Sequence, residues 1–271
     1  MTDPVFRYPT LTQAVAGDDV TLDAEQSHHA VRVRRFTPGR RIDLVDGKGL
    51  RAAGMIVTAD ASECRVLIEK IVSETYRGPV ISLIQARATD RRDEAGVEAA
   101  IQLGATRVIP WLAERSVAKW KPKTRERWQA IADAAAQVAR TSLWPQVLDP
   151  VDTRQLCAYI QAGGGQERTL VCHENASETI TAVLTGWAAS TEPPARVNVI
   201  IGPEGGITDE ELTQFAAAGA SQVLLTPTVL RVSVASAAAL SVIGSYLGRW
   251  QAPAIGEPTG HKVSGKDTKR Q

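Results

Sequence analysis

The sequence contains few of the residues that build disulfide or metal frameworks. Its 271 residues include only three cysteines, at positions 64, 157 and 172, and four histidines. The cysteines are scattered, odd in number and form no Cys-x-x-Cys pair, which argues against a disulfide framework and against a zinc knuckle. We therefore expect a protein that contains neither disulfides nor a metal ion.

Long apolar segments are also missing. No run is long enough to cross a bilayer, and the N-terminal MTDPVFRYPT lacks the apolar core of a signal peptide. We therefore expect a cytoplasmic protein with no membrane partner. With 44% hydrophobic and 23% charged residues over 271 positions, the composition is typical of a soluble globular protein with two domains.

An excess of one charge sign is lacking too, because 31 Lys and Arg residues stand against 30 Asp and Glu residues. The cations are nevertheless clustered: residues 31–41 carry five arginines and no acid, and residues 115–127 carry six cations and one acid. Clustered cations neutralise phosphates, which indicates a nucleic-acid partner. A solvated charged surface explains either run, taken alone, about equally well.

Residues 1–75 predict a small β-barrel domain. Short β-rich runs at 42–45, 54–57 and 64–71 are separated by turn residues such as Asp46-Gly47. Short strands at close spacing favour a barrel. The turn residues YRGP at 76–79 mark the domain boundary.

Residues 76–250 predict a second domain of the α/β class, in which strands alternate with helices. Such alternation indicates a parallel sheet with helices on both faces. Residues 251–271 carry Gly, Pro, Lys and Ser without periodicity, and we expect a disordered tail there. The expected strands cover 80–85, 108–111, 169–172, 197–201 and 222–225, and the expected helices cover 93–103, 124–140, 178–184, 209–218 and 235–248.

Three polar or glycine-rich loops follow strands of this domain, at 172–175, 202–206 and 226–231. Ligands of open α/β sheets bind at the carboxyl ends of strands, so these loops predict a ligand site. The middle loop, GPEGG, matches neither the phosphate-loop nor the dinucleotide pattern. A tight strand-to-helix turn that binds no ligand is the alternative.

Five motifs together indicate a family. They are HHAVRVRR at 28–35, RRDEAGVEAAIQLGATRVIPWLAERSV at 91–117, QVAR at 137–140, IGPEGGITDEE at 201–211 and LLTPTVLRVSVASAAAL at 224–240. In this order they resemble the ribosomal small-subunit RNA uridine-N3 methyltransferases of the SPOUT class. The resemblance covers nearly the whole chain.

The resemblance implies a PUA-like barrel over 1–75 and a trefoil-knot α/β domain over 76–250. It further implies a homodimer that uses S-adenosyl-L-methionine to methylate a uridine N3 in 16S ribosomal RNA or the small ribosomal subunit. Mapped onto this sequence, the cofactor residues implied are Cys172, His173, Glu174, Gly202, Pro203, Glu204, Gly205, Gly206, Leu225, Leu230, Val232 and Ser233.

The sequence departs from the family pattern at two places. Where the family commonly has Leu-Arg-Thr-Glu-Thr-Ala, this chain has Leu-Arg-Val-Ser-Val-Ala, so a carboxylate is replaced by Ser233. Where the family often has Lys-Gly, this chain has Thr89-Asp90. The roles of the missing carboxylate and of the missing lysine are therefore not carried over to this chain.

Methylation of uridine N3 requires loss of a proton, and a cation can stabilise the resulting anion. Arg231 is our first candidate for this catalytic role and Arg140 the second. His173 is a candidate base, although a loop residue that hydrogen-bonds the backbone is the favoured interpretation. Glu204 either binds donors of a ligand or braces its loop.

For RNA binding we single out five arginines, because guanidinium groups grip phosphates. Residues 32–35 alternate at strand spacing, so we expect Arg32 and Arg34 to share one face and Arg35 to lie on the other. Four tryptophans at 111, 120, 128 and 144 are able to stack on bases, but packing is the favoured role for most of them. The five RNA-binding candidates are Arg32, Arg34, Arg35, Arg115 and Arg140.

Three alternatives remain at this point. One is an RNA-binding or ribosome-assembly protein with a SPOUT-like fold and no activity. Another is a SPOUT methyltransferase that acts on a different base or on a ribose 2′-OH. The last is a Rossmann-type nucleotide-binding enzyme, whose glycine fingerprint this sequence lacks.

Overall fold

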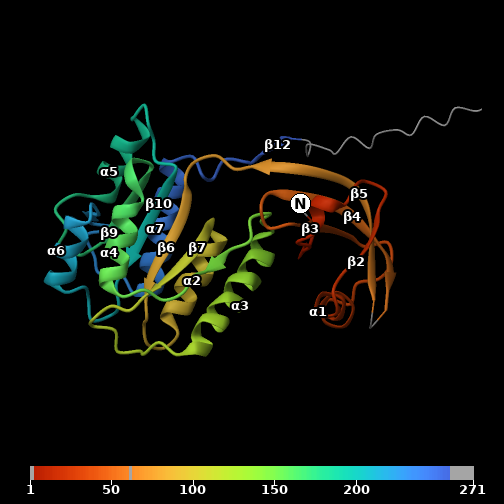
Figure 1. Ribbon diagram of the computed structural model, residues 1–271, viewed down its shortest axis with the longest axis horizontal. Coiled ribbons are helices and arrows are strands. Elements are labelled where there is room, and N and C mark those ends of the chain that lie inside the picture. Colours follow the sequence, from red (N-terminus) through yellow and green to blue (C-terminus); the bar gives the residue numbers. More distant parts are fainter. Residues whose placement is uncertain (1–2, 61–62, 257–271) are drawn as a thin grey trace, which may run out of the picture. The chain divides into compact units, whose positions relative to one another are not determined.

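The computed structural model describes residues 3–60 and 63–256. The chain divides into two compact units, each described here by itself (Figure 1). One unit comprises Asp3–Thr75 together with Ala254–Gly256, and the other comprises Tyr76–Pro253.

The N-terminal unit is a curled six-stranded sheet around one apolar core (Figure 1). The strand order is β1-β3-β4-β5-β12, and β2 pairs with β5. Alternate residues of β5 are buried, as expected for a strand with one face on a core. The strands are β1 (Val5–Arg7), β2 (Asp19–Thr21), β3 (Arg41–Val45), β4 (Leu50–Ala59), β5 (Cys64–Thr75) and β12 (Ala254–Gly256), and a 3-10 turn covers Leu11–Gln13.

Irregularities in the β4–β5 ladder help to curl this sheet. The register shifts between Ala53 and Gly54 and again between Ile56 and Thr58. A β-carbon at Gly54 would lie only 2.7 Å from a methyl carbon of Val66, so glycine permits the close approach of the two strands.

The arginine-rich run at 31–35 is helical, and the prediction of a strand there is wrong. Helix α1 (Ala24–His28) continues into a π-helical turn over His29–Val33. Asp23 caps the helix by accepting the backbone N–H of Gln26 at 2.8 Å. Residues two apart on a helix do not share a face, so Arg32 and Arg34 point in different directions.

Part of the segment predicted as a disordered tail is a strand. Residues 254–256 form β12, which pairs antiparallel with Ser73–Thr75 at the end of β5. The remainder of the predicted tail, 257–271, lies outside the described residues.

The C-terminal unit contains a fully parallel sheet in the order β11-β9-β10-β6-β7-β8. The central strands are almost wholly buried, which is why they read as continuous apolar runs. Every strand predicted for this unit is present. The strands are β6 (Val80–Ala86), β7 (Ala105–Trp111), β8 (Gln146–Val147), β9 (Glu167–Cys172), β10 (Arg196–Ile201) and β11 (Ser221–Val223).

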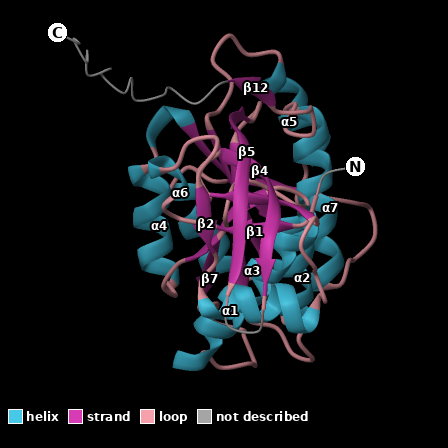
Figure 2. Cartoon of the chain, turned by 90° about the vertical axis from the view of Figure 1, so that its right-hand side faces the viewer, coloured by secondary structure: helices cyan, strands magenta, loops and turns pink. Residues whose placement is uncertain are grey.

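Helices cover both faces of this sheet (Figure 2). One face carries α2 (Arg92–Gln102), α3 (Pro122–Ala139), α5 (Ile180–Ala188) and α7 (Val232–Tyr246), and the other carries α4 (Thr153–Ala162) and α6 (Asp209–Ala217), with a 3-10 turn over Gly164–Gln166. Packing accounts for Trp111 and Trp128, which are fully buried, and for Trp144, which is 9% exposed. Within the described residues, no helix combines the length and apolarity needed to cross a membrane.

Candidate active site

Three loops meet at the carboxyl edge of the parallel sheet and form a cavity of about 550 Å³. They follow β9, β10 and β11, which are neighbours in the sheet, so their ends lie side by side. The loops comprise 172–175, 201–207 and 224–232. A concave site of this size suits a small-molecule cofactor, and the three loops are those predicted from the sequence.

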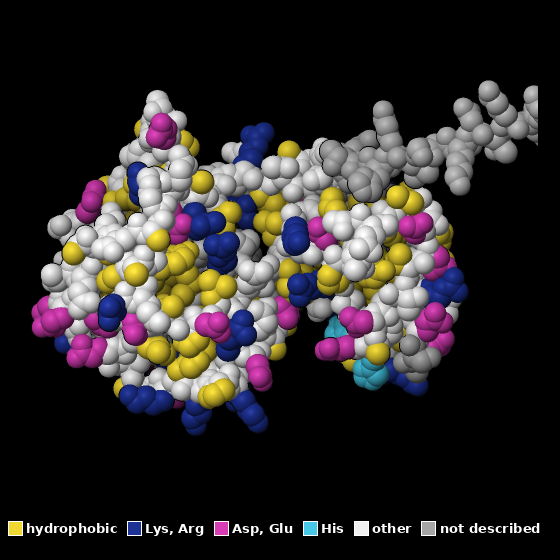
Figure 3. Space-filling view, viewed as in Figure 1, with side chains coloured by type: hydrophobic (Ala, Val, Ile, Leu, Met, Phe, Trp, Pro, Cys, Tyr) yellow, Lys and Arg dark blue, Asp and Glu magenta, His cyan; other side chains and the backbone are white. Residues whose placement is uncertain are grey.

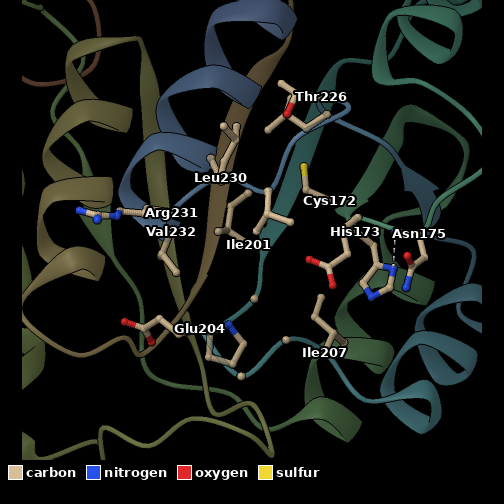
Figure 4. A pocket seen from close by; sticks show the side chains of 18 of the residues that line it. Cys172, His173, Asn175, Ile201, Glu204, Ile207, Thr226, Leu230, Arg231 and Val232 are labelled. Carbon is tan, nitrogen blue, oxygen red and sulfur yellow. Dashed lines mark hydrogen bonds between the residues drawn. The ribbon is translucent and has the colours of Figure 1, made fainter.

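The first loop holds His173 through its own backbone (Figure 4). The backbone N–H of His173 donates to the Val223 carbonyl at 3.0 Å, and the ring Nδ1 accepts the N–H of Asn175 at 3.3 Å. When Nδ1 accepts, a neutral imidazole carries its proton on Nε2. His173 is therefore a braced loop residue that presents a donor.

The second loop is a tight glycine turn after β10. The N–H of Gly206 donates to the Pro203 carbonyl at 3.0 Å, and Gly206 adopts φ 77°, a left-handed conformation that favours glycine. A β-carbon on Gly205 would lie 3.1 Å from both Cβ and the carbonyl oxygen of Arg115. Glycine at position 205 thus permits close packing on the neighbouring loop. This reason for a glycine holds whether or not a ligand is bound.

Glu204 braces this glycine loop against the start of α2. One carboxylate oxygen accepts the backbone N–H and the hydroxyl of Thr89, both at 2.9 Å, and lies 3.4 Å from the Arg92 guanidinium. Asp90 has φ 52°, which explains why the related pattern has glycine there. Thr89 and Arg92 are functional neighbours that sequence reasoning missed, because 115 residues separate Thr89 from Glu204.

The third loop leads into α7 and presents Arg231 (Figure 4). Arg231 is the N-cap residue of α7, and its exposed side chain points away from His173, toward the side where Glu204 lies. Val232 and Ala235, three residues apart on one helical face, line the cavity. Ser233 is not among the residues that line the cavity, and its contact with the cofactor stays a prediction.

Buried hydrogen bonds hold the elements behind the pocket. Glu211 is 3% exposed and closes the capping box of α6 with Thr208, and its other oxygen accepts the N–H of Glu114 and the hydroxyl of Thr153, both at 3.0 Å. On the other face, the Ser236 hydroxyl donates to Gln85 at 2.8 Å. These contacts fix the loops relative to the sheet.

Arg140 lies elsewhere. It ends α3, which runs back from the carboxyl edge of the sheet, and it lines a second cavity at the opposite edge. Within one chain, Arg140 therefore lies away from the pocket, and Arg231 remains the catalytic candidate.

Arg115, one of the predicted RNA-binding residues of this unit, lines the pocket and donates to the Gly205 carbonyl at 3.4 Å.

The pocket wall is electrically neutral at Cys172 and cationic at its rim. Burial raises the pKa of the Cys172 thiol to about 12, so the sulfur remains protonated at neutral pH. Three exposed lysines follow Arg115 in the sequence, at 119, 121 and 123. Figure 3 shows dark-blue cationic side chains on the lower edge of this unit, where the segment leading into α3 lies. No group of three metal-ligating side chains lies together among the described residues.

Comparison with known proteins agrees with both units. A model described as an RNA methyltransferase domain matches residues 77–244, and one described as an RNA methyltransferase PUA domain matches residues 22–69. Ribosomal RNA small subunit methyltransferase E of Mycobacterium bovis is 34% identical over 245 residues, covering 88% of this chain and 90% of the relative. The Bacillus subtilis protein of the same name is 26% identical over 229 residues, covering 82% and 88%.

Solved structures share the fold. One is ribosomal RNA small subunit methyltransferase E of Neisseria gonorrhoeae bound to S-adenosyl methionine, with a TM-score of 0.78, 24% identity, and coverage of 90% of this chain and 97% of that one. Another is a methyltransferase of Legionella pneumophila in complex with SAM, with a TM-score of 0.77, 25% identity, and coverage of 90% and 98%.

A parallel α/β sheet with a pocket of three loops, in a chain that also carries a PUA-like unit, defines an RNA methyltransferase of the SPOUT class, and this predicted fold class is confirmed. Within that class, the chain belongs to the ribosomal RNA small subunit methyltransferase E family. The predicted family and the predicted methyltransferase activity are thereby confirmed.

Proposed function

We propose that this chain transfers the methyl group of S-adenosyl-L-methionine to N3 of a uridine in 16S ribosomal RNA. Family membership supports methyl transfer to small-subunit ribosomal RNA. Structures of the same fold carry this cofactor. The observation that carries the proposal is the pocket of three loops with the unpartnered guanidinium of Arg231 at its rim.

The pocket fits the cofactor in size and in chemistry. Its floor includes the apolar side chains of Ile201 and Leu230. Among the described residues, the backbone N–H groups of Gly205 and Leu225 have no hydrogen-bond acceptor, so both are available to a ligand. When bound, the cofactor supplies an electrophilic methyl group on a sulfonium sulfur. We assign its binding to the residues predicted from the sequence.

The protein's own contribution is to position the uridine and stabilise its anion. His173 presents a donor, and one carboxylate oxygen of Glu204 accepts from Thr89 and Arg92. We propose that the N3 proton leaves to water. Arg231, whose guanidinium has no partner among the described residues, stabilises the negative charge on the uracil ring.

The RNA is held by cations of both units. Arg32, Arg34 and Arg35 are exposed and make no ion pair within the described residues. In the other unit, Arg115 lines the pocket, and the lysines at 119, 121 and 123 that follow it in the sequence are exposed. We also infer a homodimer in the cytoplasm. Val229 and Val234, 77% and 49% exposed beside the start of α7, offer apolar surface for a second copy.

The decisive experiment incubates the purified protein with the methyl donor and small ribosomal subunits from a strain that lacks this gene. Mass mapping of digested nucleosides should find one new N3-methyluridine. Methylation of a ribose or of a different base would instead show that the enzyme is a SPOUT methyltransferase with another target. Calorimetric titration with the cofactor gives a second check, because folded protein without micromolar heat would indicate an inactive RNA-binding protein.

A further inference from the structure

The cavity at the opposite edge of the parallel sheet contains a buried arginine, Arg249, that forms no ion pair within the described part of the chain. This cavity measures about 200 Å³ and is lined by residues such as Tyr76, Gly104, Arg140, Arg249 and Trp250. Gly104 directly precedes β7 and Tyr76 precedes β6, so the cavity lies at the amino edge. At 3.3 Å per residue, the seven residues of β6 place this edge about 20 Å from the cofactor pocket.

Arg249 is the chemically unexplained residue of this cavity. It is only 8% exposed, and its guanidinium stacks over the Tyr76 ring with 4.8 Å from Cζ to the ring centroid. A β-carbon built on Gly104 would lie 3.7 Å from Nε of Arg249, so the Arg249 side chain packs closely over Gly104. Within the described residues, Arg249 forms no hydrogen bond and no ion pair.

A buried guanidinium without a carboxylate is an unusual arrangement. Buried charges in proteins are paired, because removing a charge from water is costly. Burial lowers the pKa of Arg249, although the group remains a cation at neutral pH. The cavity thus holds the guanidinium of Arg249, whose counter-charge comes from elsewhere.

An exposed aromatic ring stands beside this cavity. Trp250 is 53% exposed, and its Nε1 would lie 2.5 Å from a β-carbon on Gly244 of α7. The missing side chain at Gly244 therefore lets the indole rest directly on the helix. A fixed, exposed indole next to a buried guanidinium matches the pairing of stacking surface and cation that binds single-stranded RNA.

We propose that this amino-edge cavity binds a phosphate group through Arg249, with Trp250 stacking on an adjacent base. The inference rests on the proposed function, since it takes the phosphate from RNA that flanks the methylated nucleotide. Guanidinium and phosphate are well matched in shape and charge. The separation of the two edges means that the bound phosphate belongs to a different nucleotide from the target.

The test compares binding of a labelled single-stranded ribosomal RNA fragment by the full chain and by three variants over a range of salt. Arg249→Met should weaken binding about tenfold and reduce the slope of log K against log salt by about 0.7, the value for one phosphate contact. Arg249→Lys, which retains charge but not the planar fork, should lose less affinity. Arg154→Met, at an exposed arginine of α4, is the matched control and should change neither quantity.

A second arm replaces RNA by inorganic phosphate and measures the melting temperature against chloride at equal ionic strength. Stabilisation that Arg249→Met abolishes, without an effect on RNA, would assign the cavity to a free phosphate compound. If wild type gains nothing from phosphate and the RNA slope of Arg249→Met equals that of Arg154→Met, the proposal is overturned. Cofactor titration of wild type is run alongside, because its failure would count against the proposed function instead.

Discussion

At the scale of residues, the polar groups of the pocket differ in whether they already have partners. Glu204 accepts from Thr89 and Arg92, and the His173 Nδ1 accepts from Asn175. Arg231 is exposed and unpartnered among the described residues. Arg231 is the permanent cation among these three groups, so we expect Arg231 to contact the uracil ring and stabilise its negative charge.

Arg231→Met should therefore reduce turnover and leave cofactor binding nearly unchanged. Loss of one donor to a developing anion costs about 100- to 1000-fold in kcat. Single-turnover methylation and cofactor calorimetry measure the two quantities. Arg154→Met serves as the control, and an unchanged kcat in Arg231→Met would remove this arginine from the mechanism.

Cys172 should resist alkylation in the native protein. With a pKa of about 12, roughly one thiol in ten thousand is ionised at pH 8. A thiolate beside a sulfonium would itself compete for the methyl group, so a protonated thiol suits the pocket. Burial also raises the pKa of Cys64 and Cys157.

Intact mass after iodoacetamide treatment at pH 8 checks this expectation. Native protein should show no adduct on Cys172, and urea-unfolded protein should show three adducts. Rapid native modification of Cys172 would mean that the thiol is more acidic and more accessible than its surroundings indicate.

At the scale of elements, the glycine loop is held from outside by α2 and by the segment around Arg115. Glu204 accepts a hydrogen bond from Thr89 next to the start of α2. Gly205 packs so closely on Arg115 that little room is left for a side chain at position 205. The loop is thus positioned before any ligand arrives. Preorganisation of this kind lowers the entropic cost of binding.

Glu204→Gln should weaken cofactor binding roughly three- to tenfold, because a charged acceptor contributes more than a neutral one. The melting temperature should change little, since the bond is partly exposed. Calorimetry measures the affinity, with Glu192→Gln in a distant exposed loop as the control. Equal affinity in both variants would show that the loop keeps its position without this brace.

Periodicity in the sequence predicted the strands and most helices of the C-terminal unit, and the failures have physical causes. The run VRVRR alternates like a strand, yet Ser27 and Ala30 are the residues that pack inward, at helical spacing. Ser27 also accepts the N–H of Cys64 at 3.2 Å, a contact no local pattern reveals. Helix α4 was missed although Asp152 and Gln155 form a capping box that signals its start.

The pocket itself was predicted well, because parallel strands bring consecutive loops to one edge. The place of Arg140 at the opposite edge was not predicted, since the direction of α3 decides it. The hydrogen bonds from Thr89 to Glu204 were not predicted either, because they join loops that are far apart in the sequence.

At the scale of the whole molecule, charge is distributed unevenly although the total is nearly neutral. The N-terminal unit exposes three arginines, at 32, 34 and 35, that form no ion pair within the described residues, and the C-terminal unit exposes lysines at 119, 121 and 123. Phosphate binding depends on such local clusters more than on net charge. The trefoil knot that the resemblance implies stays a prediction.

Reversing Arg32 and Arg34 to Glu should weaken RNA binding and leave cofactor affinity unchanged. If each contacts one phosphate of a single strand, the salt slope should fall by about 1.4. Fluorescence anisotropy at several salt concentrations measures it, with Arg154→Glu as the charge-matched control. Because the two arginines point in different directions, the single variants should differ from each other, and identical RNA affinity in all variants would exclude this helix from the interface.

The pairing of β12 with β5 has a consequence for the order of synthesis. The N-terminal unit acquires its last strand only when residues 254–256 emerge, after the entire methyltransferase unit has been translated. Until then the end of β5 is an uncovered sheet edge, the kind of surface that invites pairing with other chains. A nascent chain that stalls before residue 254 would carry this open edge beside a completed catalytic unit, so premature termination near the end of the message should favour aggregation over a shortened but well-behaved product.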